Sequence, residues 1–237
     1  MNYFLILTFL FAVGSVTGWC IELIYRRFVS QKHWVNPGFL AGPCLPLYGF
    51  SLCILYLLAQ IEENIPIGNV IWRKLLLFLL MGAAITAVEY AVGRVMIAAA
   101  HVRLWDYSEC RGNIQGIICP QYSFYWMLLS ALYYFLVHPH ILASLEWLSQ
   151  NLAFSFGIGF FYGILVIDFS YSAQLVAKIR RYADEQQIVV RLEGLREHVR
   201  NGLETRKPRF LLSLKTDRPF NEILEEYAAR LNTLRKK

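Results

Sequence analysis

Five stretches of apolar residues alternate with short polar segments over the first part of the chain. They cover residues 3–25, 46–60, 75–100, 122–137 and 152–176. A bilayer core about 30 Å thick is crossed by roughly 20 apolar residues of α-helix, and a helix satisfies its own backbone hydrogen bonds in lipid. The pattern therefore predicts an all-α polytopic membrane protein with five transmembrane helices.

Composition divides the chain into an apolar body and a basic tail. Of the 237 residues, 57% are hydrophobic and 17% are charged, against about 25% charged in typical soluble domains. Residues 1–177 carry eight basic and eight acidic residues, whereas residues 178–237 carry fifteen and nine. This excludes disorder and a conventional cytosolic domain, and it predicts a transmembrane domain over 1–177 and a helical cytoplasmic tail over 178–237.

The basic residues that flank the apolar stretches predict the orientation. Cytoplasmic loops carry an excess of Lys and Arg, and such residues follow the first, third and fifth stretches. Between the second and third stretches there are only Arg73 and Lys74, and no Lys or Arg lies between the fourth and fifth. We expect a multi-pass protein of the cell (plasma) membrane with its N-terminus outside, its C-terminus in the cytoplasm and an uncleaved first span.

Two predicted cytoplasmic loops, residues 36–50 and 105–122, follow the same order of residue types. Each runs from an asparagine through glycines and apolar residues to a cysteine, a proline and a tyrosine. A glutamate, Glu22 or Glu89, lies in the apolar stretch before each loop. The order predicts a parallel internal repeat about an axis along the membrane normal.

These loops are too rich in glycine and proline for regular helix and too apolar for simple solvated connectors. Non-helical backbone at membrane depth is tolerated where it packs in protein or lines a polar cavity. We therefore expect folded or re-entrant loops, and the alternative is a pair of amphipathic surface loops anchored by Trp34 and Trp105.

Ionisable residues inside the apolar stretches are the candidate functional groups. Glu22 lies four residues before Arg26 and can form a pair within one helix, whereas the partner of Glu89 is expected on another helix or loop. One interpretation is a polar cavity for a cation or a lipid head group; the other is that the carboxylates accept hydrogen bonds from loop amides. The candidate polar site comprises Glu22, Asn36, Glu89, Arg103, Asp106, Asn113 and Asp168.

No catalytic, metal or nucleotide motif is present in the sequence. The cysteines Cys20, Cys44, Cys53, Cys110 and Cys119 lack CxxC spacing, so reduced structural thiols are expected and no metal site is predicted. The histidines form no HExxH motif, and no GxxxxGK[ST] loop occurs. We predict no cofactor, and ATP would have to be bound by a separate subunit.

The tail predicts two amphipathic helices. Ile188, Leu192, Leu195, Val199 and Leu203 follow helical spacing, a break is expected at residues 207–208, and a second helix is expected to begin at residues 217–219. Basic residues beside a cytoplasmic leaflet attract anionic lipid by about 1 kcal/mol each. Packing on each other, on a second copy or on a partner protein is an alternative, and nucleic acid is not expected.

A motif of glycine, proline, aromatic and serine residues runs through the two loops and follows Gly18, Trp19 and Glu22 in the first apolar stretch. Its residues are Gly38, Gly42, Pro43, Pro46, Tyr48, Gly49, Trp105, Tyr107, Ser108 and Gly116. In this motif the chain resembles the CmpB-type family of ABC-transporter type IV permeases, found mainly in bacteria. The resemblance covers about residues 10–135, with departures at Pro37 and Pro120, and we expect the motif to have a structural role in the loops.

The resemblance and the intramembrane carboxylates together predict a permease-like component of a transport system that needs a separate ATPase or oligomerisation. A second hypothesis is a membrane enzyme acting on lipid head groups, with Asp106 or Glu22 as base and Arg103 or Arg111 holding phosphate. A third is a non-catalytic, lipid-sensing scaffold that depends on its tail. The sequence gives neither a substrate nor a reaction.

Overall fold

The computed structural model describes residues 2–30, 32, 34–186, 188–202, 222–227 and 229, which are mostly helical. Four helical segments are long and apolar enough to cross a membrane: Tyr3–Ser30, Val70–Ala100, Pro120–Gln150 and Leu152–Glu185. A shorter apolar helix covers Pro46–Gln60. The prediction of a helical chain with membrane-spanning segments is confirmed at this level.

The first hairpin consists of α1 (Tyr3–Tyr25), which continues as a π-helical turn η1 (Arg26–Ser30), and α2 (Pro46–Gln60). These helices approach closely because small residues lie between them. A Cβ atom on Gly18 would lie 2.2 Å from the Cβ atom of Tyr48, and one on Gly49 would lie 2.7 Å from the carbonyl oxygen of Phe11. Proline occupies the first turn of α2, where its missing N–H costs no helical hydrogen bond.

The second hairpin consists of α3 (Val70–Ala100) and α4 (Pro120–Leu132), and the 3₁₀ turn η2 (Glu62–Asn64) joins the first hairpin to it. The side chain of Asn69 caps α3 by accepting from the amides of Ile71 and Trp72. Helix α3 ends at His101, whose φ of 53° is left-handed. Like α2, helix α4 begins with a proline.

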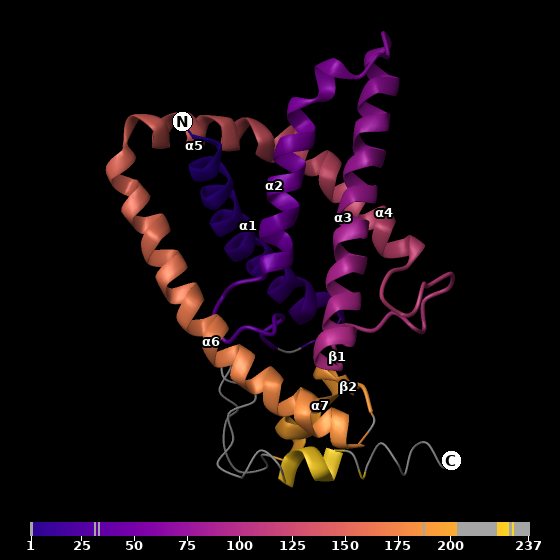
Figure 1. The fold of residues 1–237 in the computed structure, drawn as a ribbon. Coiled ribbons are helices and arrows are strands. Elements are labelled where there is room, and N and C mark those ends of the chain that lie inside the picture. The colour runs from indigo at the N-terminus through magenta and orange to yellow at the C-terminus, as the bar shows by residue number, and fades with distance from the viewer. Residues whose placement is uncertain are drawn as a thin grey trace.

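After α4 the chain turns across one end of the bundle. A π-helical segment η3 (Tyr133–Val137) leads into α5 (His138–Gln150), which carries Pro139 in its first turn. Helix α5 lies across the end that also carries the N-terminus (Figure 1). The 3₁₀ turn η4 (Leu152–Phe154) then leads into α6 (Ser155–Gln186), which returns to the opposite end and runs past residue 177 without a break.

Two clusters of buried apolar residues hold these elements together. One joins α1, α2, α3, η3 and α5 through residues such as Leu10, Leu77 and Leu145. The other joins the end of α3 to the end of α6 and to the tail through Val102, Ile179 and Leu195. The tail residues that the structure describes are therefore packed against the body.

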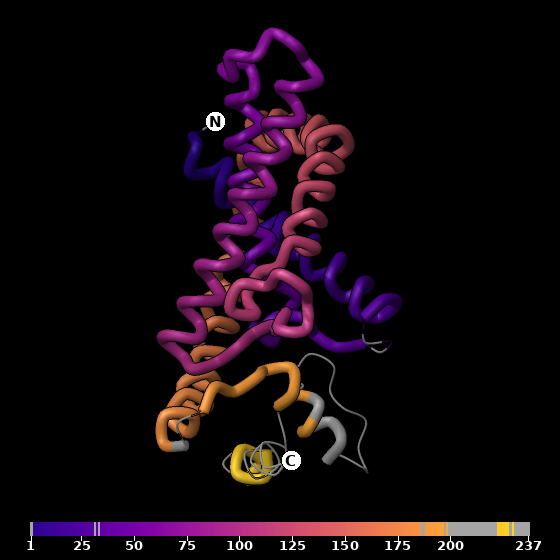
Figure 2. The backbone as a smooth tube through the Cα atoms, turned by 90° about the vertical axis from the view of Figure 1, so that its right-hand side faces the viewer, coloured from indigo at the N-terminus to yellow at the C-terminus, as the bar shows by residue number. Residues whose placement is uncertain are grey.

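At this second cluster the chain forms a feature that the helical pattern does not predict. Two short strands, β1 (Val102–Arg103) and β2 (Val190–Arg191), pair in parallel, with Val102 opposite Val190. Helix α7 (Leu192–Gly202) follows β2, so a helix is present where the tail pattern predicted one, but it begins at residue 192. Figure 2 shows α7 beside the last turns of α6 and past the end of α3, with the helical residues 222–227 farther out.

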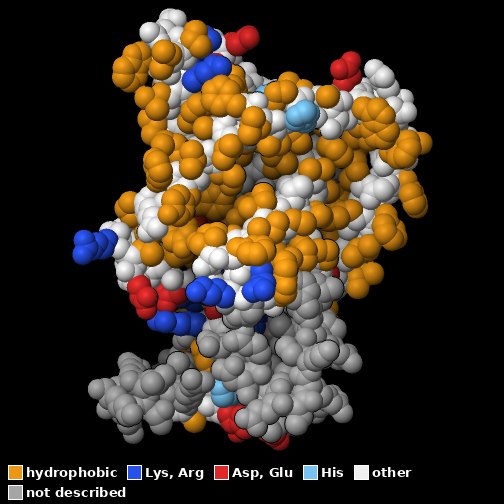
Figure 3. All heavy atoms as spheres, turned by 180° about the vertical axis from the view of Figure 1, so that it is seen from behind, with side chains coloured by type: hydrophobic (Ala, Val, Ile, Leu, Met, Phe, Trp, Pro, Cys, Tyr) orange, Lys and Arg blue, Asp and Glu red, His pale blue; other side chains and the backbone are white. Residues whose placement is uncertain are grey.

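The second tail helix is only partly covered by the structure. Residues 222–227 are helical, with Ile223, Leu224 and Tyr227 buried. The predicted break at residues 207–208 and the predicted start at residues 217–219 lie outside the described residues. On the face shown in Figure 3, apolar side chains cover the middle of the described body, and most charged side chains lie toward its two ends.

Candidate functional site

Loop 1 (residues 34–45) is folded by the side chain of Asn36, which is 1% exposed. Its Nδ2 donates to the carbonyl oxygens of Leu40 and Ala41 at 2.9 and 3.0 Å. Its Oδ1 accepts from Nε1 of Trp19 on α1 at 2.8 Å. One buried amide thus closes the loop and attaches it to α1, which satisfies backbone polar groups that a buried loop would otherwise leave unpaired.

Asp168 attaches the same loop to α6. Its two carboxylate oxygens accept from the backbone amides of Ala41 and Gly42 at 2.9 and 2.8 Å. A Cβ atom on Gly42 would lie 2.8 Å from Oδ2 of Asp168, so a glycine is needed for the carboxylate to reach the amide. The next residue, Pro43, is exposed. Cys44 is buried, and its burial raises the pKa of its thiol.

Loop 2 (residues 104–119) is folded in a similar way by Asn113. Its Nδ2 donates to the carbonyl oxygens of Ser108 and Cys110, and its Oδ1 accepts from the amide of Gly116 at 2.9 Å. Gly116 has a φ of 67° and no room for a Cβ atom beside Arg103. Trp105 donates to the carbonyl oxygen of Ile117 at 2.8 Å.

Asp106 is the charged centre of loop 2. It pairs with Arg103 at 2.8 Å and with Arg191 of β2 at 3.0 Å, and it accepts from the amide of Ser108 at 3.1 Å. Burial acts to raise the pKa of Asp106, but the hydrogen bonds from Ser108 and Arg103 and the charge of Arg191 outweigh it and lower the pKa. Asp106 is therefore a carboxylate held in its ionised form.

Glu22 lies at the end of α1 and has two partners from the first hairpin. It pairs with Arg26 at 3.0 Å, one helical turn on, and accepts from the hydroxyl of Tyr48 on α2 at 3.1 Å. Tyr48 is thus a direct partner of a site residue as well as part of the loop motif. The spacing of Glu22 and Arg26 had indicated this pair.

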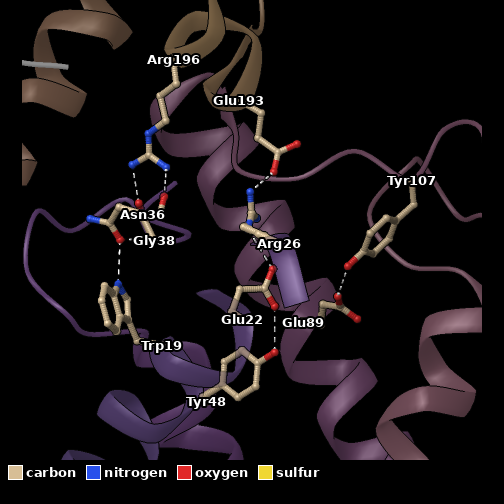
Figure 4. A network of polar contacts seen from close by, with 10 residues as sticks. All are labelled: Trp19, Glu22, Arg26, Asn36, Gly38, Tyr48, Glu89, Tyr107, Glu193 and Arg196. Carbon is tan, nitrogen blue, oxygen red and sulfur yellow. Dashed lines mark hydrogen bonds and ion pairs between the residues drawn. The ribbon is translucent and has the colours of Figure 1, made fainter. Parts of the chain in front are cut away.

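Glu89 lies on α3, is 2% exposed, and has neutral partners (Figure 4). It accepts from the hydroxyl of Tyr107 in loop 2 at 3.0 Å and from Nε1 of Trp126 on α4 at 3.0 Å. Burial and the charge of Glu89 raise the pKa of Tyr107, so its hydroxyl remains a donor. No ion pair joins Glu89 to a cationic side chain in the described part of the chain.

The two glutamates are connected through aromatic rings. Tyr48, the partner of Glu22, and Trp126, the partner of Glu89, are in edge contact with centroids 5.4 Å apart. The structure therefore brings Glu22 and Glu89 to one region between the two hairpins. It places Asn36 and Asp168 in and beside loop 1, and Arg103, Asp106 and Asn113 within loop 2.

The sequence analysis did not single out several residues that complete this arrangement. The contact between Trp126 and Glu89 cannot be predicted from local spacing, because the two residues lie 37 positions apart in the sequence. Glu193 and Arg196 lie off the apolar stripe of the predicted tail helix, so the helical spacing assigns them no partner. In the structure Glu193 pairs with Arg26 at 2.6 Å, and Arg196 donates to the carbonyl oxygen of Asn36 at 2.7 Å (Figure 4). The helical spacing of buried Leu192 and Leu195 indicated only the apolar face of this helix.

The charged and hydrogen-bonding side chains of this region hold the two loops to the helices. Among the described residues, no group of three or more His, Cys, Asp or Glu side chains is placed to hold a metal ion. The cysteines are free thiols. The region contains the buried carboxylate of Glu89, which lies between two aromatic hydrogen-bond donors. It also contains the two folded loops at one end of the bundle.

Comparisons with known proteins give a family for the chain. The family model described as "Putative ABC-transporter type IV" matches residues 9–173. No curated protein matches the chain. No solved structure matches it either.

Proposed function

Because the chain belongs to the family described as "Putative ABC-transporter type IV", we propose that it is the membrane-embedded, permease-like component of a transport system. Its long apolar helices support a membrane location. The sequence holds no GxxxxGK[ST] loop, so ATP hydrolysis would come from a separate subunit. Transport would then require that subunit, or further copies of the chain, to complete a pathway.

The observation that carries this proposal is the environment of Glu89. A carboxylate buried to 2% exposure among apolar helices is costly unless it is neutralised, and ionisable residues inside a membrane mark ion, proton or substrate pathways. Trp126 and Tyr107 supply hydrogen bonds but no charge. We propose that Glu89 takes up a proton or a cation during the transport cycle.

The proposed topology has five crossings, with α2 as the second. Its 15 residues span about 22 Å at 1.5 Å per residue. This is shorter than a hydrocarbon core of about 30 Å, so the bilayer would have to thin locally around α2. The N-terminus would be outside and the two loops and the tail in the cytoplasm. The two hairpins, each with a glutamate before a loop and a proline at the next helix start, would form a parallel internal repeat.

The proposal is tested by measuring ion flux into proteoliposomes that contain the chain alone or the chain with its co-purified partner. Protons are followed with a pH-sensitive dye, and sodium and potassium with radioisotopes. Glu89→Gln, which keeps the size of the side chain, should reduce flux to the level of empty vesicles. Glu109→Gln is the control, because Glu109 is exposed in loop 2 and should leave flux unchanged. Full flux with Glu89→Gln would contradict the proposal.

Asp106 bears on the hypothesis of a lipid head-group enzyme. A general base works best with a pKa near the operating pH, whereas Asp106 lies between Arg103 and Arg191 with a lowered pKa. Such a carboxylate is a weak base. The geometry therefore favours a structural role for Asp106 within a transport component.

A further inference from the structure

Residues 188–202, here called the strap, cover the end of the bundle that loops 1 and 2 form, here called the loop end. The strap begins beside β1, where the amide of Val190 donates to the carbonyl oxygen of His101 at 3.0 Å. It continues into α7, whose Leu192 and Leu195 are buried against the ends of α3 and α6. Arg191 of the strap also pairs with Asp106 of loop 2 at 3.0 Å, so the strap touches loop 2 and the body of the bundle together.

Arg196 is the polar contact between the strap and loop 1. Its side chain is 8% exposed, and its two terminal nitrogens donate to the carbonyl oxygens of Asn36 and Gly38. Within the described residues Arg196 has no carboxylate partner, and its Nε atom has no hydrogen-bond partner. Burial, helped by the nearby charge of Arg26, lowers the pKa of Arg196 to about 10.

Two neighbouring loop carbonyls thus serve as an acceptor pair for one guanidinium, a geometry that suits the planar fork of arginine. The Asn36 side chain folds loop 1 through hydrogen bonds to Leu40 and Ala41 that do not involve the strap. Arg26 is a second such contact, since it already pairs with Glu22 and additionally binds Glu193 at 2.6 Å. Arg26 therefore has a partner in the body besides the strap, and so does the side chain of Asn36.

The strap lies outside the part of the chain that defines the family, because the family match ends at residue 173. We propose that the loop end is a binding surface for an amphipathic helix that carries a glutamate and an arginine three residues apart, and that the strap is its exchangeable resident ligand. A helix of this chemistry on a partner protein would compete with the strap. The binding of such a helix at the loop end does not require that the chain transports any particular substrate.

The first test is hydrogen exchange of the full-length protein in lipid nanodiscs. Arg196→Met keeps the apolar stem but removes the guanidinium, and it should speed exchange in residues 188–202 and 36–42 by about tenfold or more. The control is Arg181→Met, because Arg181 is 85% exposed on α6 and should change nothing. Unchanged exchange in the strap, or faster exchange spread over all the long helices, would overturn the proposal.

The second test supplies the strap in trans, as a fluorescent peptide of residues 188–202. The peptide should bind the full-length Glu193→Gln/Arg196→Met variant at least about tenfold more tightly than the wild-type chain, because a tethered ligand has a high effective concentration and excludes its competitor. The same peptide carrying Arg196→Met should not bind the variant. Equal binding to both chains, equal binding of both peptides, or no binding of the wild-type peptide would refute an exchangeable ligand.

The outcome of these two tests does not depend on whether the transport proposal is correct. Loss of flux with Glu89→Gln tests the charge inside the bundle, whereas strap exchange and peptide binding are measured without any flux. A chain that transports but whose strap never exchanges would retain the first proposal and lose the second.

Discussion

Asp106 shows how a single charged residue can make the fold sensitive to acid. Its pKa in the folded protein is lowered, below the ordinary aspartate value of about 3.9. A carboxylate of this kind stabilises the fold fully above the ordinary value and loses that contribution as the pH falls through the lowered pKa. The stability of loop 2 should therefore decline in acid.

Asp106→Asn is expected to lower the unfolding temperature at neutral pH, because the pairs with Arg103 and Arg191 are lost. The deficit relative to the wild type should shrink as the pH falls below the ordinary aspartate pKa. Thermal unfolding in detergent, followed by tryptophan fluorescence over a pH series, measures it. Glu109→Gln serves as the control, and a deficit that stays constant into strong acid would disprove the linkage.

Asp168 is the corresponding residue for loop 1. Asp168→Asn replaces one acceptor oxygen by an amide that faces the N–H of Ala41 or Gly42, and hydrogen bonds to a charged group contribute about 1.5–3 kcal/mol each. Loop 1 should open more often and expose Cys44, which is buried. Maleimide labelling of Cys44 should accelerate, whereas Glu185→Gln, an exposed change on the same helix, should not alter it.

At the scale of elements, the α1–α2 contact depends on Gly18. A methyl group there would lie 2.2 Å from the Cβ and Cγ atoms of Tyr48, and these atoms cannot move without moving α2. Overpacking typically costs about 1–3 kcal/mol, which exceeds the gain of about 1 kcal/mol from replacing a helical glycine by alanine. Close packing of α1 on α2 at Gly18 is therefore needed for the fold, and it is also needed for the hydrogen bond from Tyr48 to Glu22.

Gly18→Ala should therefore lower the unfolding temperature and the yield of folded protein. Gly163→Ala is the matched change, since Gly163 lies on α6 with no atom within 4 Å of the Cβ position, and it should leave stability unchanged or raise it slightly. Size-exclusion profiles after stepwise heating compare the two variants. Equal stability of both variants would show that α1 and α2 do not pack as closely as in the structure.

Helices were predictable from the sequence because long apolar runs have few stable conformations in lipid. The expected first stretch, residues 3–25, coincides with α1, and the apolar residues 46–60 form α2. Helix α6 extends to Gln186 because polar helical residues continue it beyond the apolar run. The strand pair at Val102 and Val190 was not predictable, since two residues give no periodicity and the partner lies far along the chain.

The candidate site was predictable where its contacts are local. The pair of Glu22 and Arg26 follows from one turn of helix. The partners of Glu89 lie 18 and 37 residues away, and only the fold brings them together. Likewise, the amphipathic spacing of α7 identifies its apolar face but cannot show that loop carbonyls meet Arg196 on another face.

For the whole molecule, the arrangement in the membrane rests on whether α2 crosses it. Basic residues gather at the loop end, including Arg26, Arg103 and Arg191, whereas Arg73 lies near the tip between α2 and α3. If α2 crosses, this tip and the loop end face opposite sides, and the excess of basic residues predicts that the loop end faces the cytoplasm. Gly68 in the tip has open space around it, so it accepts a reporter cysteine.

Gly68→Cys should react with a membrane-impermeant maleimide in intact cells, because the tip is expected outside. Glu109→Cys, an exposed position in loop 2, should react only after the membrane is permeabilised, and the wild-type chain gives the background from its native thiols. Reaction of Glu109→Cys alone in intact cells would reverse the orientation. The two positions are joined by α3, and α2 lies beside α3 between the same two ends (Figure 1). Reaction of both positions from the same side would therefore show that neither α2 nor α3 crosses, and the two hairpins could then not be related as parallel repeats.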